Sequence, residues 1–185
     1  MHIAVAGNIG AGKYNDGSRE NRFILAQRLA DGMTKAWEGT KLEPVTARDM
    51  NWEIVPVLLP PSEAIQKLKG KVNMNDTVQL KASAKKMLWL QRYETGKMID
   101  ISCLSLGSAR ILHMPGELFV EYQLAAKKMR PDLFVALAAY GDADPGYICT
   151  AKAYEEGGYE AGVSNVGPES EKILMKAIEK LLVSK

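Results

Sequence analysis

The sequence predicts a layered α/β domain in which helices flank a mixed β-sheet. Two β-rich runs, Met98 to Leu106 and Ala109 to Met114, are joined only by Gly107-Ser108, a connection typical of an antiparallel hairpin. Other β-rich runs are separated by stretches whose apolar residues have helical spacing. A hairpin combined with helix-linked strands indicates a mixed sheet rather than a purely parallel one. At 185 residues the whole chain, 1–185, is expected to form a single domain.

Helix caps and turn residues place the elements in the first half of the chain. Ser18 is expected to be the N-cap of a helix from about Glu20 to Trp37, and Gly39 is expected to end it. Pro56 predicts an edge position for the strand Trp52 to Leu59, because proline cannot donate to a sheet ladder. The other expected elements are the strand His2 to Ala6, the glycine-rich loop Gly7 to Arg19, a short helix from Pro60 to Lys69, and a helix capped by Asp76 or Thr77 that runs to about Thr95.

The second half of the sequence predicts a helix, a strand and a last helix, in that order along the chain. Pro115-Gly116-Glu117 is expected to open a helix that runs to about Met129. Glu117 would then lie in the first turn, where a carboxylate interacts favourably with the helix dipole. The apolar run Leu133 to Ala139 is expected to be a buried strand, and a last helix is expected from about Pro168 to Val183.

The stretch from Ala139 to Gly162 shows neither helical nor strand periodicity, and we expect the chemistry of the protein to lie there. Four of the seven tyrosines fall in it, together with several glycines and carboxylates. Loops this long are uncommon in compact domains and are usually functional or disordered. The aromatic content disfavours disorder. The remaining alternative is a structured surface loop whose tyrosines pack on the core.

Composition excludes several classes of function. A net charge of +2 predicts no nucleic-acid partner, and no apolar run reaches the roughly 18 residues of a membrane span. The first residues lack the apolar segment of a secretory signal, so the chain as given is expected to be soluble and cytoplasmic. Cys103 and Cys149 are too few and too far apart for a disulfide framework, and each is expected to be a small buried or loop residue.

The glycine-rich loop Gly7 to Lys13 resembles a phosphate-binding P-loop, which would make the chain a nucleotide-binding or kinase-type domain. The motif requires a serine or threonine after the lysine to bind magnesium, but Tyr14 stands there. It also requires a helix that begins at the lysine, whereas Asn15-Asp16-Gly17 is a turn signal. The nucleotide-binding hypothesis therefore remains an alternative.

Three further strings resemble the neutral ceramidase family, in its neutral/alkaline non-lysosomal branch. They are AGNIGAGKYNDGSRENR near the start, ILHMPGELFVEYQ in the middle and AAYGDADPGYICTAKAYEEGGYE near the end. The second and third strings are the specific parts. The resemblance runs from about Ala6 to Leu182 and covers the later, C-terminal part of the family's catalytic domain.

The resemblance implies a zinc site. In the family, zinc is held by two histidines from the earlier part of the domain, a glutamate in a Pro-Gly-Glu-Phe-like motif, and a tyrosine. The glutamate matches Glu117 and the tyrosine matches Tyr147, while Tyr159 would lie near the oxyanion. The two family histidines are absent, since neither His2 nor His113 occupies a ligand position, so the zinc site is expected to be incomplete.

The sequence differs from the family at the position of the nucleophile. Lys13 stands where the family has its serine, which leaves a serine-type transfer unsupported. A zinc-bound hydroxide could still hydrolyse an amide directly, with Lys13 as an electrostatic partner. The surrounding loop supplies the expected substrate-binding residues, which are Asn8, Gly10, Asn15 and Asp16.

The leading hypothesis is a truncated ceramidase-like zinc amidohydrolase domain. Its intact relatives would act on an N-acyl lipid or another amide, and this chain would be either inactive alone or active with a complementing chain. A third hypothesis, beside the hydrolase and the nucleotide-binding domain, is a non-catalytic remnant or protein-binding module. A missing half would expose apolar surface, so self-association is expected.

Overall fold

The computed structural model describes residues 6–10, 12, 15–71, 75–141, 143 and 145–183, and contains a four-stranded mixed sheet. The strand order is β1-β2-β3-β5, with antiparallel β1/β2 and β2/β3 pairs and a parallel β3/β5 pair. The sheet strands are β1 (Met50–Val57), β2 (Ile99–Leu106), β3 (Ala109–Pro115) and β5 (Phe134–Gly141). The predicted mixed sheet, the β2–β3 hairpin and the edge position of β1 are confirmed.

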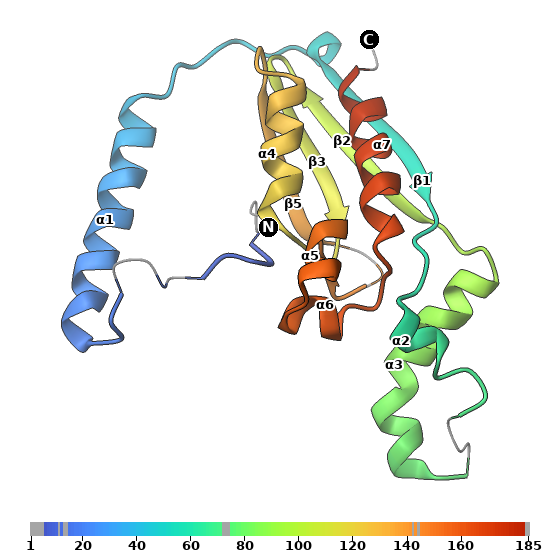
Figure 1. The fold of residues 1–185 in the computed structure, drawn as a ribbon. Coiled ribbons are helices and arrows are strands. Elements are labelled where there is room, and N and C mark those ends of the chain that lie inside the picture. The colour runs from blue at the N-terminus through green and yellow to red at the C-terminus, as the bar shows by residue number, and fades with distance from the viewer. Residues whose placement is uncertain are drawn as a thin grey trace.

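Two helices cover one face of the sheet and form the core with it. They are α4 (Val120–Met129) and α7 (Glu169–Val183), which lie side by side across the strands (Figure 1). Apolar side chains from β2, β3 and β5 meet those of the two helices in one buried cluster. Its most deeply buried members include Ile101, Cys103, Leu112, Leu137, Tyr122, Ala126, Leu174, Ile178 and Leu182. The buried state predicted for the two cysteines is confirmed, and neither forms a disulfide.

The opposite face of the sheet, which we call the open face, keeps large apolar side chains in solvent. Trp52 pairs across the strands with Leu104, which pairs with Ile111, and Ile54 lies two residues along β1. Trp52 and Ile54 are each 51% exposed, and Phe134 at the start of β5 is also exposed. Because strand residues alternate between faces, these side chains point away from α4 and α7. The open face is therefore an apolar surface on the described part of the chain.

Helix α1 (Arg19–Glu38) is present as predicted but does not pack on the sheet. Ser18 caps its first turn by accepting a hydrogen bond from the backbone N–H of Asn21, and Gly39 ends it. No α1 residue is buried, and Figure 1 shows the helix standing apart from the sheet. The helical spacing of its apolar residues correctly indicated a helix, but these residues make no core. None of the described helices combines the length and apolarity needed to cross a membrane.

The remaining helices lie at one end of the sheet. They are the short α2 (Glu63–Gln66), α3 (Thr77–Glu94) with Asp76 as its N-cap, α5 (Ala151–Glu156) and α6 (Tyr159–Val163), and a 3-10 turn, Ala47–Asp49, precedes β1. The prediction for α3 is confirmed, and α2 is shorter than expected. The predicted strand His2 to Ala6 falls almost entirely outside the described residues.

Two sequence expectations are wrong. Glu117 does not open a helix: it lies in a short strand, β4 (Glu117–Leu118), which pairs in parallel with β6 (Tyr147–Ile148), and α4 begins only at Val120. The stretch from Ala139 to Gly162 is not one long loop, because β6, α5 and most of α6 lie in it. In both places pairing between segments distant in sequence, together with closely spaced glycines, determined the structure more than local periodicity did.

Candidate functional site

The pairing of β4 with β6 brings Glu117 and Tyr147 together as direct neighbours. The backbone N–H of Glu117 donates to the carbonyl oxygen of Gly146 (2.9 Å), and that of Phe119 donates to the carbonyl oxygen of Ile148 (3.1 Å). Adjacent strands lie about 4.8 Å apart, so two paired residues can direct their side chains to one point. The glutamate and the tyrosine singled out in the sequence are therefore adjacent in space.

Two glycines allow the β4 and β6 backbones to approach closely at this point. Gly116 has φ +60° and Gly146 has φ +72°, both in the left-handed region that favours glycine. A β-carbon on Gly116 would lie 2.6 Å from the carbonyl oxygen of Gly146 and 2.6 Å from Cγ of Pro145. The Pro-Gly-Glu string therefore marks a turn from β3 into β4, just after a break in the β3/β5 register between His113 and Pro115.

Tyr140 is a site residue that sequence reasoning did not single out. Its hydroxyl donates to Oε1 of Glu117 over a long 3.4 Å contact, and its backbone has φ +61°, which is uncommon for a non-glycine residue. Burial and the neighbouring carboxylate of Glu117 raise the pKa of Tyr140 above its ordinary value. Its positive φ at the end of β5 is the kind of backbone strain that clusters at functional sites. The apolar run before it carries no signal for that conformation.

Tyr159 completes a small aromatic group beside Glu117. Its ring meets the ring of Tyr147 edge to face, with centroids 6.2 Å apart. It belongs to the first turn of α6, which follows Gly157-Gly158. The carboxylate of Glu117, with partial loss of solvent as a second cause, raises the pKa of Tyr147, so this phenol is protonated at neutral pH. The structure therefore brings together three of the predicted site residues, Glu117, Tyr147 and Tyr159.

The glycine-rich loop contributes one predicted residue to the surroundings of this group. Gly7 donates its backbone N–H to the carbonyl oxygen of Leu118 (2.9 Å). The side chain of Asn8 donates to the carboxylate of Glu121 (2.8 and 3.1 Å) and accepts from the backbone N–H of Val120 (2.9 Å). Asn8 therefore holds the loop against the segment that follows Glu117.

The other predicted residues of that loop lie elsewhere. Gly10 has no neighbouring atom within 4 Å of the position of a β-carbon. The side-chain oxygens of Asn15 and Asp16 accept backbone N–H groups of the turn that leads into α1, from Gly17 and Ser18 respectively. Lys13 lies outside the described residues. Since α1 begins only at Arg19, no described helix starts at the end of the glycine-rich motif.

Glu117 and Tyr147 carry oxygen atoms of the type that binds a divalent cation, but two such ligands are too few for a catalytic metal. Glu117 and Tyr147 are paired neighbours that each carry a side-chain oxygen, and a cation between them would offset the electrostatic effect of the carboxylate on the phenol. Catalytic zinc normally takes three protein ligands. No group of three or more histidine, cysteine, aspartate or glutamate side chains suited to a metal occurs among the described residues. These two oxygen donors alone are therefore one fewer than a catalytic zinc site takes.

A cleft of about 430 Å³ borders Tyr140 on the open face. Its wall includes Asp100, Ser102 and His113 from β2 and β3. The imidazole of His113 packs against the indole of Trp52 with ring centroids 5.0 Å apart, and its Nδ1 atom is buried without a hydrogen-bond partner. Tyr140 therefore lies between this cleft and the residues Glu117, Tyr147 and Tyr159, which we call the Glu117 group. The cleft has both apolar walls and polar side chains.

The fold resembles part of the chain of one ceramidase of known structure. No protein-family model matches the chain, no curated protein matches it significantly, and four chains of known structure match it. One is the neutral ceramidase from Pseudomonas aeruginosa, with a TM-score of 0.50 and 16% identity over 81% of this chain. The chain spans 30% of the length of that ceramidase. A second is a ceramidase complexed with C2, with a TM-score of 0.42 and 20% identity over 46% of this chain and 14% of its own. At 16% identity the likeness to the neutral ceramidase shows a shared fold and nothing more.

Proposed function

We propose that this chain is a ceramidase-like hydrolase domain whose Glu117 and Tyr147 bind zinc beside a cleft for an N-acyl lipid or a related amide. The observation that carries the proposal is the β4–β6 pairing, which places these two residues side by side with Tyr159. The fold shared with a neutral ceramidase supports the reaction class. A bound zinc ion would supply a Lewis acid to polarise an amide carbonyl.

The roles of the chain's own residues follow from their positions. Glu117 and Tyr147 would hold the metal, and the exposed phenol of Tyr159 would donate a hydrogen bond to a developing oxyanion. The apolar walls of the cleft next to Tyr140 would accept an acyl chain, because they exclude water from it. Two oxygen ligands are one short of the usual catalytic set, so amide hydrolysis would require a further ligand from a complementing chain.

Zinc binding by the metal-free chain tests this proposal. We expect one zinc ion per chain by calorimetry, and we expect both Glu117→Gln and Tyr147→Phe to weaken binding at least about tenfold, since each removes one of two ligands. Glu155→Gln is the matched control, because Glu155 lies on α5 outside the Glu117 group. Absence of zinc binding, or equal affinity in Glu117→Gln and Glu155→Gln, would show that the pair holds no metal.

The open face supports a second part of the proposal, self-association with another copy of the chain. Four strands, each of seven or eight residues, give a face of about 500 Å², or about 1,000 Å² for two copies, from strand spacings of about 4.8 Å and rises of about 3.3 Å. Specific interfaces start near that size, so a weak dimer is expected.

Sedimentation velocity over a range of concentrations measures this association. Wild type is expected to form a dimer at high concentration, and Trp52→Lys is expected to remain a monomer, because it replaces a large exposed apolar side chain of the open face with a charge. Leu124→Lys is the control, since Leu124 is an exposed leucine on α4, on the other side of the sheet. A monomeric wild type, or equal association in both variants, would argue against this interface.

A further inference from the structure

The second strand of the candidate site, β6, has only two residues, so its pairing with β4 alone does not account for the position of Tyr147. On the side of β4, two carbonyl oxygens, those of Gly146 and Ile148, accept backbone N–H groups. A two-stranded pair is marginal in water unless other parts of the fold support it. The position of Tyr147 beside Glu117 must therefore depend on contacts at the other edge of β6.

The other edge of β6 is bound to residues 164–167, which lie between α6 and α7 and which we call the α6–α7 connection. The hydroxyl of Ser164 donates to the carbonyl oxygen of Tyr147 (2.7 Å). The backbone N–H of Asn165 donates to the carbonyl oxygen of Pro145 (3.2 Å). Ser164 is only 4% exposed, so its bond to Tyr147 is shielded from water. The chain just before β6 and within it is therefore held from both edges.

Tyr154, on α5, determines where the hydrogen of the Ser164 hydroxyl points. Two carbonyl oxygens lie within reach of this hydroxyl, that of Tyr147 at 2.7 Å and that of Val166 at 3.1 Å. The phenol of Tyr154 lies 2.8 Å from the Ser164 oxygen and donates to the carbonyl oxygen of Val166 (2.6 Å). Each hydroxyl has one hydrogen, and buried acceptors are normally satisfied. Donation from Tyr154 to Val166 therefore leaves the Ser164 hydrogen for Tyr147.

The α6–α7 connection is itself fixed by the chain that follows β1. The backbone N–H of Ser62 donates to the carbonyl oxygen of Asn165 (3.0 Å), and the N–H of Gly167 donates to that of Pro60 (2.8 Å). Ser62 holds the N-cap position of α2, yet its hydroxyl donates to the carbonyl oxygen of Ser164 (2.9 Å) rather than capping the helix. The connection therefore offers β6 a support that is bonded to another part of the fold.

We propose that Ser164 is a positioning residue of the Glu117 group, which holds the backbone of Tyr147 so that the phenol stays beside Glu117. Its hydroxyl bonds to the main chain of Tyr147, so it acts on the site through position alone. Removing the hydroxyl leaves the carbonyl oxygen of Tyr147 without this donor, and an unsatisfied buried acceptor favours movement of β6 toward water. The consequence for zinc rests on the proposed function, in which Tyr147 is a ligand, whereas the placement of β6 does not.

Amide hydrogen exchange in Ser164→Ala tests the proposal. The N–H groups of Glu117 and Phe119 donate to carbonyl oxygens on the β6 side, so their exchange reports opening of the β4–β6 pair, whereas core amides of α7 report unfolding of the whole domain. We expect exchange at Glu117 and Phe119 to become at least about tenfold faster, with a smaller change in α7. Unchanged exchange at these two amides, or an equal increase in α7, would overturn the positioning role.

Tyr154→Phe is a second variant, which keeps the ring and decides the question even if Ser164→Ala does not fold. Without the phenol, the Ser164 hydrogen is shared between two carbonyl oxygens, so we expect exchange at Glu117 and Phe119 to become several-fold faster. If Ser164→Ala does not fold, exchange like that of wild type in this second variant would contradict the proposal.

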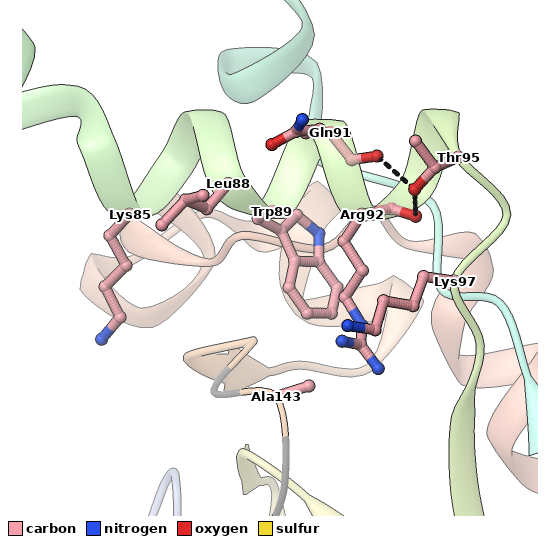
Figure 2. A pocket seen from close by; sticks show the side chains of 8 residues that line it. All are labelled: Lys85, Leu88, Trp89, Gln91, Arg92, Thr95, Lys97 and Ala143. Atoms are coloured by element: carbon pink, nitrogen blue, oxygen red, sulfur yellow. Dashed lines mark hydrogen bonds between the residues drawn. The ribbon is translucent and has the colours of Figure 1, made fainter.

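Two controls remove a comparable bond elsewhere. Ser62→Ala removes a buried hydroxyl that bonds to the α6–α7 connection and not to Tyr147. Thr95→Ala removes a hydroxyl at the end of α3, which lies 2.8 and 3.2 Å from two backbone oxygens of the preceding turn (Figure 2). Both are expected to leave exchange in the β4–β6 pair within about twofold of wild type. An increase in either control as large as that in Ser164→Ala would count against a special role for Ser164.

Zinc calorimetry on the same variants keeps this inference separate from the proposed function. If wild type binds zinc, Ser164→Ala is expected to bind it several-fold more weakly than Ser62→Ala does. If wild type binds no zinc but exchange in the β4–β6 pair is faster in Ser164→Ala, the metal site is refuted and the positioning role stands. If zinc affinity and exchange are both unchanged in Ser164→Ala, the metal site stands and the positioning role is refuted.

Discussion

Gly116→Ala is expected to lower the free energy of unfolding by about 2–5 kcal/mol. A left-handed backbone costs an L-residue about 1–2 kcal/mol, and forcing an extra carbon into a packed site costs about 1–3 kcal/mol more. At Gly116 both effects apply, because φ is +60° and the new β-carbon would lie 2.6 Å from a backbone oxygen. The atoms it meets belong to Pro145 and Gly146, immediately before Tyr147, so the β4–β6 pair would separate. Chemical denaturation measures the loss of stability.

The same variant is expected to lose zinc affinity, because the separation moves Glu117 away from Tyr147. Gly32→Ala is the matched control: Gly32 lies in α1, where an added β-carbon meets no atom within 4 Å. Alanine is favoured over glycine in a helix by up to about 1 kcal/mol, so this change is expected to be neutral or slightly stabilising. If Gly116→Ala and Gly32→Ala unfold at the same denaturant concentration, the close approach of the two strands is not needed.

Ile178→Ala is expected to lower the free energy of unfolding by about 2–5 kcal/mol, the usual range for truncating a buried aliphatic side chain. Ile178 is 0% exposed on α7, which packs across β1 and β2. Truncation removes apolar contacts and leaves a cavity in the one core of the sheet. Thermal or urea unfolding followed by circular dichroism measures the effect.

Met33→Ala provides the contrast for this prediction. Met33 lies on the apolar stripe of α1 and is 65% exposed, so its truncation is expected to change stability by less than about 0.5 kcal/mol. If Met33→Ala destabilises the protein as much as Ile178→Ala does, α1 packs against apolar surface in solution.

The parts of the fold that were predicted correctly carry local signals. Ser18 and Asp76 are side-chain caps whose hydrogen bonds lie within one helical turn, so the sequence alone indicates where α1 and α3 begin. Gly107-Ser108 likewise determines the β2–β3 hairpin within a few residues. Such features need no knowledge of distant contacts.

The start of α4 could not be predicted because it depends on a distant contact. Pro-Gly-Glu has the composition of a helix start, yet Glu117 pairs with Tyr147, thirty positions further along the chain. The stretch after β5 posed the opposite difficulty. Thr150 caps α5 by accepting the N–H of Ala153. The helix is only six residues long and glycines follow it, so the local sequence pattern did not indicate a helix.

The candidate site was predicted only in part. Glu117, Tyr147 and Tyr159 were proposed because their motifs resemble a family, and nothing in their local periodicity indicated that they would meet. Tyr140 was not proposed as a site residue, since its role depends on a positive φ at the end of a strand. Backbone strain of this kind becomes visible only when the neighbouring strands are in place.

The isolation of α1 means that this chain has two levels of thermodynamic stability. A helix of this length that buries none of its residues is marginal in water, so α1 is expected to open and close by its own helix–coil equilibrium while the sheet and α7 stay folded. Its amide protons would therefore exchange with solvent much faster than those of α7. Because Gly7 and Asn8 are bonded to the segment around Leu118, the melted segment remains a loop closed at both ends. The entropic cost of closing such a loop rises only slowly with its length, so a long segment between Asn8 and β1 destabilises the fold only slightly.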